Sequence, residues 1–330
     1  MFNNATVLIT GGSGSFAHAF IREIFNRYSP RKVVVYSRDE HKQYEMRKRF
    51  SQSNLRFLIG DVRERDRLMV ALKGVDFVVH AAALKQVPIA EYNPMECIKT
   101  NIYGAENVVQ AAWTQGVKRV VALSTDKAVN PVNLYGATKL ASDKLFVAAN
   151  NMVGGESTRY SVVRYGNVVG SRGSVVPHFR QLAEGGATAL PITDARMTRF
   201  WITLQQGVEF VFKAFNRMKG GEIFVPKIPS VRIIDLAKAI APKLTHDIIG
   251  LRPGEKIHEV MCPCDESHLT LEFDDHYVIQ PAIRFFSGDE DYCVNQLTEA
   301  GKSVEPGFEY NSGANPSFLS IDEIRRIGFD

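Results

Sequence analysis

The stretch LITGGSGSFAHAF (residues 8–20) decides how this chain folds. Gly11, Gly14 and Ala17 give it the spacing G-x-x-G-x-x-A, directly after an apolar run (5–10) and at the start of a helical segment. A glycine turn in this place lets backbone N–H groups approach a pyrophosphate at the positive end of a helix. The pattern predicts a dinucleotide-binding turn, and the alternative is a tight turn without a ligand.

Apolar runs continue along the first half of the chain, at 32–37, 55–60, 76–83, 119–124 and 160–166, with segments of helical length between them. Alternation of nearly continuous apolar strands with helices predicts an α/β fold with a doubly wound parallel sheet buried on both faces. Such Rossmann-type sheets bind ligands beyond the carboxyl ends of their strands.

The alternation weakens after Gly166. The sequence predicts a loop at 166–177, helices at about 177–185 and 203–218, a strand at 222–226 and a helix at 230–244 with Ser230 as its N-cap. We therefore expect two interleaved domains. The dinucleotide-binding domain comprises 1–166 plus about 201–226, and a smaller α/β substrate domain comprises 167–200 plus 227–330.

Composition excludes several classes of protein. The 330 residues are 45% hydrophobic and 23% charged, as is ordinary for a globular enzyme, and the net charge of +4 is mild. Basic residues are mixed with acids and no nucleic-acid-binding signature is present, so nucleic acid is not an expected partner. The cysteines (Cys97, Cys262, Cys264, Cys293) lack a zinc-site pattern, so we expect reduced thiols and no metal. Without a signal peptide or an apolar run long enough to span a membrane, we expect a cytoplasmic protein that does not contact membranes.

The end of the second predicted strand bears on the choice of cofactor. It reads YSRDEHK (36–42), so Ser37 and Arg38 come first, and an arginine there can pair with a 2′-phosphate. Asp39 follows, and an acid at this point would favour a free ribose hydroxyl. We favour NADP over NAD. Asp61 follows the third strand, where it can bond an adenine amino group.

An acid–base cluster follows the fifth strand, in ALSTDKAVNPVNLYGATKLASDKLF (122–146). Tyr135 and Lys139 stand four apart and share a helix face, so the ammonium is expected to lower the pKa of the phenol. Such a phenol can take a proton from a sugar hydroxyl while hydride leaves the same carbon. Asp126 and Lys127 precede it; the alternative for this pair is a surface salt bridge.

The chain resembles the extended short-chain dehydrogenase/reductase family over nearly its whole length. The resemblance lies in TGGSGSFA (10–17), GDV (60–62), HAAA (80–83), KTNIYGAENV (99–108), STDK (124–127), YGATK (135–139) and RYGNVVGSRGSVVP (164–177). Ala17 replaces the family's usual third glycine and is small enough for close helix–strand packing. Asn101 lies where the family keeps an asparagine that supports its catalytic tyrosine and lysine.

Subfamilies differ in the pair after strand five. Dehydratases that retain configuration at carbon 5 carry Asp-Glu, and 4-epimerases need only the tyrosine. The Asp126-Lys127 pair, with the segments 81–101, 197–203, 222–230 and 250–261, makes this chain similar to configuration-inverting UDP-N-acetylglucosamine 4,6-dehydratases, which start pseudaminic acid biosynthesis for flagellin glycosylation. The implied product is UDP-2-acetamido-2,6-dideoxy-β-L-arabino-hex-4-ulose. A retaining dehydratase, a 4-epimerase and a non-catalytic NADP-binding regulator remain as alternatives.

The resemblance implies a division of labour in that reaction. Oxidation at carbon 4 makes the carbon 5 proton acidic, Lys127 removes that proton, and Asp126 protonates the departing 6-hydroxyl. We expect Asp126 protonated and Lys127 neutral, through proton transfer between them. Hydride then returns to carbon 6. Lys127, Tyr135 and a water remain alternatives as the group that reprotonates carbon 5.

The resemblance also implies three sets of site residues and a homo-oligomer, such as a hexamer. The catalytic set is Thr125, Asp126, Lys127, Tyr135 and Lys139. The cofactor set is Gly11, Ser13, Gly14, Ser15, Phe16, Ser37, Arg38, Lys42, Asp61, Val62, Ala81, Ala82, Ala83, Tyr135 and Lys139. The substrate set is Lys85, Leu123, Ser124, Asn167, Val168, Ser171, Arg172, Arg199, Arg252, Glu255 and Asn315, with Arg199 and Arg252 expected on the pyrophosphate.

Overall fold

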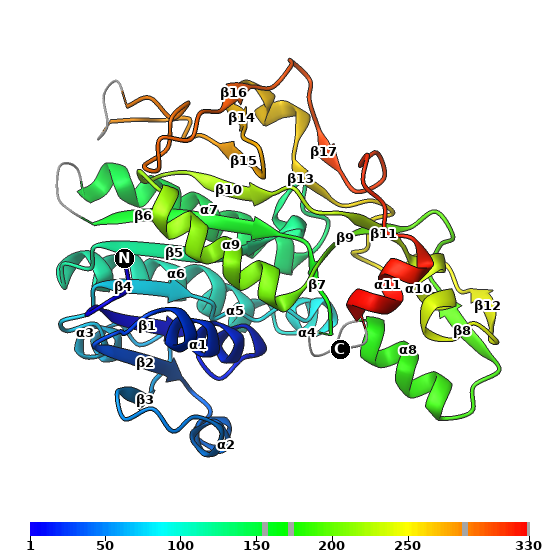
Figure 1. Cartoon of the computed structure of the whole chain (residues 1–330), viewed down its shortest axis with the longest axis horizontal. Coiled ribbons are helices and arrows are strands. Elements are labelled where there is room, and N and C mark those ends of the chain that lie inside the picture. Colours follow the sequence, from blue (N-terminus) through cyan, green and yellow to red (C-terminus); the bar gives the residue numbers. More distant parts are fainter. Residues whose placement is uncertain (154–157, 171–174, 286–289, 329–330) are drawn as a thin grey trace.

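A ten-stranded sheet organises the computed structural model, which describes residues 1–153, 158–170, 175–285 and 290–328. The strand order is β16-β14-β15-β10-β6-β5-β4-β1-β2-β3 (Figure 1). The parallel strands are β1 (Thr6–Thr10), β2 (Lys32–Ser37), β3 (Leu55–Ile59), β4 (Phe77–His80), β5 (Arg119–Thr125), β6 (Arg159–Tyr165) and β10 (Ile223–Pro226). The antiparallel strands β15 (His276–Ile279), β14 (Thr270–Glu272) and β16 (Lys302–Ser303) extend one edge.

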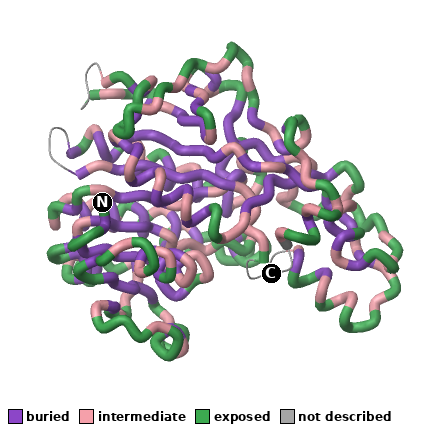
Figure 2. Tube along the Cα trace, viewed as in Figure 1, coloured by how far each residue is buried: buried purple, intermediate pink, exposed green. Residues whose placement is uncertain are grey.

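Helices cover both faces of this sheet (Figure 1). On one face α1 (Ser15–Arg27) packs against α9 (Leu204–Arg217). On the other, α6 (Gly104–Thr114) lies between α3 (Arg65–Ala71) and α7 (Leu134–Val153). The remaining elements of this half are α2 (Glu40–Arg49), α4 (Val87–Tyr92), α5 (Pro94–Ile98), the π-helix η1 (Lys99–Tyr103) and the 3-10 turn η2 (Asp126–Ala128). The central strands are therefore buried, as Figure 2 shows, and all five residues of β1 are buried.

A cluster of aromatic rings anchors the N-terminus to the sheet and its covering helices. Phe2 is 0% exposed, and its ring meets the rings of Tyr28, Phe77, Phe212 and Phe215 edge-on at 5.2–5.4 Å. Edge-to-face contacts add to the stabilisation from burial. Phe2 therefore contributes to the hydrophobic core of the large sheet, although it lies before β1 in the sequence.

Phe2→Ala is expected to lower the free energy of unfolding by about 3–5 kcal/mol, because it removes a buried ring and leaves a cavity. Urea denaturation followed by circular dichroism measures the change. Phe285→Ala is the control, since Phe285 is 85% exposed. Equal midpoints for the two variants would contradict this role of Phe2.

A smaller lobe has its own core, in which Trp201, Leu236 and Ile324 are buried together. Its sheets pair β7 (Asn167–Val168), β9 (Thr198–Ile202) and β11 (Ser230–Arg232), and β8 (Ala189–Ile192) with β12 (Thr245–Ile248). A further pair, β13 (Val260–Cys262) with β17 (Tyr310–Asn311), packs on the core of the large sheet through Met261, Cys262 and Tyr310. The helices α8 (Val175–Glu184), α10 (Ile233–Ile240) and α11 (Ile321–Gly328) belong to this lobe (Figure 1), and the 3-10 helix η3 (Cys264–Leu269) follows β13.

The predicted α/β class, the six N-terminal strands and the strand at 222–226 are confirmed. The helix predicted from Ser230 is wrong at its start. Ser230 pairs with Phe200 in β11, and α10 begins at Ile233 with Arg232 at its N-cap. The domain boundary also differs, because β14–β16 join the large sheet whereas the sequence placed all of 227–330 in the second domain. Within the described ranges, no helix is long and apolar enough to cross a membrane.

Candidate active site

The glycine turn between β1 and α1 has no room for side chains. Gly11 has φ +62°, and a Cβ there would lie 2.9 Å from the backbone of Ala81 and Ala82. Gly14 is the N-cap of α1 and supplies no capping side chain, so the first N–H groups of the helix stay open to a ligand. The turn is thus a cradle that a phosphate group can approach closely.

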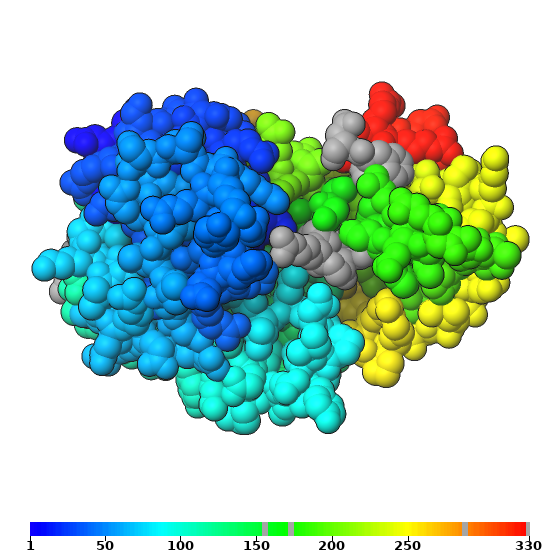
Figure 3. All heavy atoms as spheres, turned by 90° about the horizontal axis from the view of Figure 1, so that it is seen from below, coloured from blue at the N-terminus to red at the C-terminus, as the bar shows by residue number. Residues whose placement is uncertain are grey.

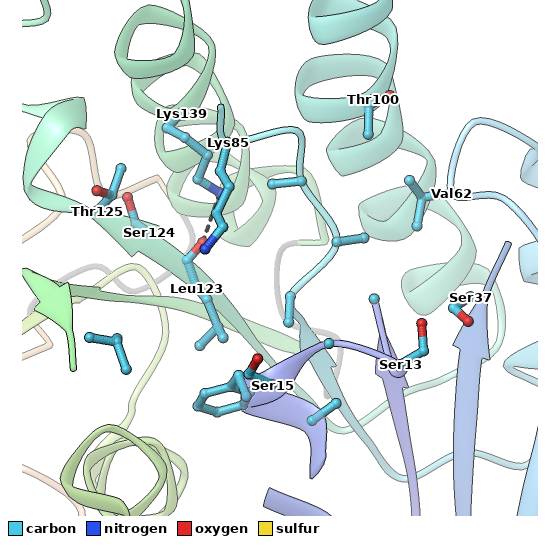
Figure 4. A pocket seen from close by; sticks show the side chains of 18 of the residues that line it. Ser13, Ser15, Ser37, Val62, Lys85, Thr100, Leu123, Ser124, Thr125 and Lys139 are labelled. Atoms are coloured by element: carbon cyan, nitrogen blue, oxygen red, sulfur yellow. Dashed lines mark hydrogen bonds between the residues drawn. The ribbon is translucent and has the colours of Figure 1, made fainter. Parts of the chain in front are cut away.

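A cavity of about 590 Å³ lies beyond the carboxyl ends of the parallel strands. Strand order reverses between β1 and β4, where open α/β sheets bind their ligands. All the predicted cofactor and catalytic residues line this cavity, as do Lys85, Leu123, Ser124, Asn167 and Val168 from the substrate set. Figure 3 shows the molecule hollowed between its N-terminal part and the lobe around α8. Figure 4 shows Ser13, Ser37, Lys85 and Lys139 around the cavity.

Two cations and two carboxylates line the cavity beside the carboxyl ends of β2 and β3: Arg38, Lys42, Asp39 and Asp61. Arg38 is exposed for 52% of its side chain, and its Nη1 lies 3.5 Å from Oδ2 of Asp61. The carboxylate of Asp39 caps α2 by accepting from the backbone N of Lys42 at 2.9 Å, and its other oxygen lies 2.6 Å from Lys42 Nζ. Gln43 donates to the oxygens of Ser37 at 3.0 Å. Both Arg38 and Asp39 line the cavity, but Asp39 is held by α2 and Lys42, whereas Arg38 has a longer contact with Asp61 and is half exposed.

The acid–base cluster forms where β5 ends. Thr125 ends the strand, η2 carries Asp126 and Lys127, and α7 brings Tyr135 and Lys139. Asp126 is 0% exposed. Its Oδ1 accepts from Thr125 Oγ1 at 3.0 Å and from Lys127 Nζ at 3.1 Å. A contact between a buried carboxyl and an amine allows direct proton transfer between them.

Burial raises the pKa of Asp126, and the nearby Glu259 carboxylate acts in the same direction against the opposing effect of Lys127. This makes the Asp126 carboxylate a better proton acceptor than an exposed carboxylate. Burial opposes the charge of Lys127, but Asp126 and Glu259 outweigh it and raise the pKa of the lysine. In the free site these two carboxylates favour the ammonium form of Lys127, so the predicted neutral amine requires transfer of its proton to Asp126.

The pKa of Tyr135 also differs from expectation. Burial raises it to about 12, although Lys127 and a hydrogen bond with Thr125 act in the opposite direction. Lys139 is not among the main groups that lower it; the Nζ of Lys139 donates to the carbonyl of Leu123 at 2.7 Å, the dashed line in Figure 4. Burial lowers the pKa of Lys139 itself.

Asn101 supports the helix that carries these two residues. Its amide donates to Thr138 Oγ1 at 3.0 Å, and that hydroxyl donates to the carbonyl of Tyr135 at 2.9 Å. Asn101 also pairs with both backbone groups of Leu84, at 2.8 and 2.9 Å. The π-turn η1 thus ties the first turn of α7 to the loop after β4.

Four of the predicted substrate residues do not line the cavity: Arg199, Arg252, Glu255 and Asn315. Arg199 donates to the carbonyls of Thr198 and Ile257, at 2.7 and 3.1 Å. Arg252 pairs with Glu255 at 2.7 Å, and Asn315 donates to the carbonyl of Ile228 at 2.9 Å. Ser171 and Arg172 lie outside the described residues.

Two buried carboxylates near the cluster were missed from the sequence. Glu259 lies 3.3 Å from Lys127 Nζ. Asp143 accepts from Ser124 Oγ at 2.7 Å and pairs with Arg164 at 3.3 Å. Asp143 follows Lys139 by four positions on one helix, so helical spacing would have found it. No spacing signal links Glu259 to the cluster.

Comparison with known proteins shows which family the chain belongs to. A model of the family described as "Polysaccharide biosynthesis protein" matches residues 7–281. The chain belongs to this family. It is 59% identical over 327 residues to UDP-N-acetylglucosamine 4,6-dehydratase (inverting) of Campylobacter jejuni, covering 99% of this chain and 98% of that one. The resemblance to extended short-chain dehydrogenases/reductases is confirmed.

The chain is also similar to a second relative and to a solved structure over nearly its whole length. UDP-glucose 4-epimerase of Rickettsia canadensis is 40% identical over 337 residues, covering 99% of this chain and 96% of that one. Among solved structures, Pen from Bacillus thuringiensis superimposes with a TM-score of 0.89 at 36% identity, covering 99% of this chain and 97% of that one. The fold of the family therefore extends through both lobes.

Proposed function

We propose that the protein is a UDP-N-acetylglucosamine 4,6-dehydratase that inverts configuration at carbon 5. The observation that carries this proposal is the buried Asp126–Lys127 contact of 3.1 Å, which lines the same cavity as Tyr135. An elimination needs both an acid and a base, and this pair supplies them next to a candidate oxidation base. The 59% identity to an inverting dehydratase supports the same assignment.

The cavity residues fit a nicotinamide dinucleotide. Gly11 and Gly14 would hold its pyrophosphate, because a Cβ at Gly11 would fill the cradle. Arg38 would meet a 2′-phosphate, which favours NADP. When bound, this cofactor supplies reversible hydride transfer. The homo-oligomer and the place of the reaction in pseudaminic acid biosynthesis stay predictions.

The chain's own side chains divide the proton transfers. Tyr135 takes the proton of the 4-hydroxyl, for which it must be ionised. Because its pKa is raised, the phenolate needs a nearby positive charge in the complex to stabilise it. Lys127 passes a proton to Asp126, which leaves an amine and a carboxylic acid. The amine removes the proton at carbon 5, and Asp126 protonates the 6-hydroxyl, which leaves as water.

The main alternative is a 4-epimerase, since one relative named as such is 40% identical. Epimerisation at carbon 4 does not change carbon 6, so the Asp126–Lys127 pair would have no role in that reaction. Keeping two opposite charges at a site where Asp126 is 0% exposed is unfavourable without a function. The pair therefore favours dehydration.

Proton NMR of the protein with UDP-N-acetylglucosamine in deuterium oxide tests the proposal. A 6-deoxy-4-keto product with deuterium at carbon 5 and the L-arabino configuration is expected. The D-xylo product would show retention. A 4-epimer with an intact 6-hydroxyl would establish the epimerase instead.

The choice of cofactor has its own test. Arg38→Ala is expected to weaken NADP binding by about 10- to 100-fold, because a charge-assisted hydrogen bond contributes about 1.5–3 kcal/mol. NAD has no 2′-phosphate and serves as the internal control, with its affinity nearly unchanged. Isothermal titration with both cofactors measures the ratio, and equal losses for both would remove Arg38 from cofactor selection.

A further inference from the structure

A second carboxyl lies behind the Asp126–Lys127 pair and does not line the cavity. Glu259, which is 2% exposed, directly precedes β13 in the chain. Its Oε1 lies 3.3 Å from Lys127 Nζ and 3.8 Å from Arg199 Nε, and its Oε2 lies 3.5 Å from Lys256 Nζ. Lys127 therefore stands between two carboxyls, Asp126 in front and Glu259 behind.

The two carboxyls differ in how many cations they face. Glu259 has three within 4.0 Å, whereas Asp126, within the described part of the chain, has Lys127 alone. Oδ2 of Asp126 and Oε2 of Glu259 are both buried without a hydrogen-bond partner among the described residues, so the number of nearby cations is what distinguishes the two carboxyls. A proton on the pair of carboxyls is therefore accommodated better by Asp126, and Glu259 remains the anion.

Glu259 is also held rigidly. Its backbone N donates to Ser312 Oγ at 2.9 Å, and Ser312 N donates back to its carbonyl at 2.8 Å. Two of its cations are fixed too, since Arg199 donates to the carbonyl of Ile257 at 3.1 Å and Lys256 to that of Val129 at 2.6 Å. A carboxylate held in this way can fix the position of the Lys127 amine and influence its protonation.

We propose that Glu259 is a positioning residue for the dehydration step: it stays ionised, holds the nitrogen of Lys127, and leaves Asp126 to receive the proton that Lys127 gives up. This inference rests on the proposed function. When the proton moves from Lys127 Nζ to Asp126 Oδ1, an N–H bond breaks and an O–H bond forms. The neutral amine keeps two N–H groups and one lone pair, and donation to Glu259 turns the lone pair toward the cavity.

The proton balance of the Asp126–Lys127 pair closes within the elimination step. The amine takes the carbon 5 proton and becomes an ammonium again, and Asp126 gives its proton to the departing hydroxyl and becomes a carboxylate again. The proton that carbon 5 gains when hydride returns to carbon 6 is balanced by the one that Tyr135 took from the 4-hydroxyl. Glu259 gains and loses nothing. Its role is to keep Lys127 in reach while the charge on the lysine changes.

Every charged group around Lys127 bears on its titration. Asp126 and Glu259 favour the ammonium, whereas Arg199 opposes it. Lys85 and Tyr135 also feel its charge. Because Asp126 and Lys127 titrate as a coupled pair, removing the negative charge of Glu259 should lower both macroscopic pKa values of that pair.

Glu259→Gln tests the proposal, because it keeps the shape and removes the charge. We expect kcat for dehydration to fall by about 10- to 100-fold while the KM for UDP-N-acetylglucosamine changes by less than about threefold. Both limbs of the pH profile of kcat should move to lower pH. Reduced nicotinamide should also accumulate in a single turnover, because oxidation through Tyr135 continues while elimination slows.

Further variants separate positioning from folding. Glu259→Asp keeps the charge and should leave the pH limbs in place. Lys256→Met removes a cation from Glu259 and should move both limbs to higher pH, which tests the inference even if Glu259→Gln does not fold. Glu299→Gln is the matched control, since that carboxylate pairs with Arg217 at 2.7 Å away from the cavity.

Two outcomes would overturn the inference. One is a folded Glu259→Gln variant with the kcat and pH profile of the wild type. The other is a loss of kcat with unmoved pH limbs and no reduced nicotinamide, which indicates a structural role only. A wild-type protein that makes no 6-deoxy-4-keto product would instead overturn the proposed function, and this inference with it.

Discussion

Tyr135→Phe is expected to lower kcat by about 10²- to 10⁴-fold, the range for loss of a general base. The change removes only the phenolic oxygen, so cofactor and substrate should still bind. Without a base for the 4-hydroxyl, hydride cannot leave carbon 4, and none of the later steps can begin. We therefore expect neither 6-deoxy-4-keto product nor reduced nicotinamide in a single turnover.

The control for Tyr135→Phe is Tyr160→Phe. Tyr160 is equally a buried tyrosine, and its hydroxyl donates to the carbonyl of Val109 at 2.8 Å, away from the cavity. This variant should lose some stability and keep its turnover. If Tyr135→Phe instead accumulated reduced nicotinamide, oxidation would proceed without the phenol, and Tyr135 would act later in the reaction.

The sequence predicted the parts of the fold that depend on short-range signals. Apolar runs identified the strands from β1 to β6, because a strand buried on both faces needs nearly continuous apolar residues. The glycine turn was predictable for the same kind of reason. Gly11 has φ +62° and touches backbone, which leaves no alternative residue.

The parts that failed depend on partners far away in the chain. Ser230 has the composition of a helix cap, yet it pairs with Phe200 in an antiparallel sheet that local sequence does not reveal. Arg199 has the right chemistry for a pyrophosphate, but backbone carbonyls already occupy one of its nitrogens. Residue type alone does not show which acceptors lie nearby.

Protonation states were the least predictable property of the site. Spacing placed Tyr135 and Lys139 on one helix face, but it gave no measure of burial, which dominates the pKa of Tyr135. The state of Lys127 depends on Glu259, a residue that the fold brings from the second half of the chain. The sequence therefore indicated where the proposed acid and base lie, but not the effect of burial and of Glu259 on their charges.

Lys127→Met is expected to lower the rate of dehydration by about 10²- to 10⁴-fold, because it removes the proposed base at carbon 5. Oxidation at carbon 4 should continue, since Tyr135 remains. The variant should therefore hold reduced nicotinamide and a 4-keto sugar that keeps its 6-hydroxyl. Stopped-flow absorbance of the reduced nicotinamide, with NMR of the quenched sugar, measures both. Wild-type dehydration in this variant would remove Lys127 from the reaction.

The same variant makes a prediction about stability with a definite sign. Without the ammonium, Asp126 and Glu259 face each other as buried carboxylates, and loss of one partner from a buried pair destabilises by about 3–5 kcal/mol. Their pKa values then rise above those of the unfolded chain, so the folded state binds more protons and its stability falls as pH rises. Thermal unfolding across pH should therefore show Lys127→Met losing stability relative to the wild type as the pH rises above about 4, the ordinary carboxyl pKa, until both carboxyls are ionised. Lys144→Met, whose side chain is 58% exposed and pairs with Glu266, should show no such slope. A parallel pH dependence in Lys127→Met and the wild type would mean that the lysine does not hold the two carboxylates together.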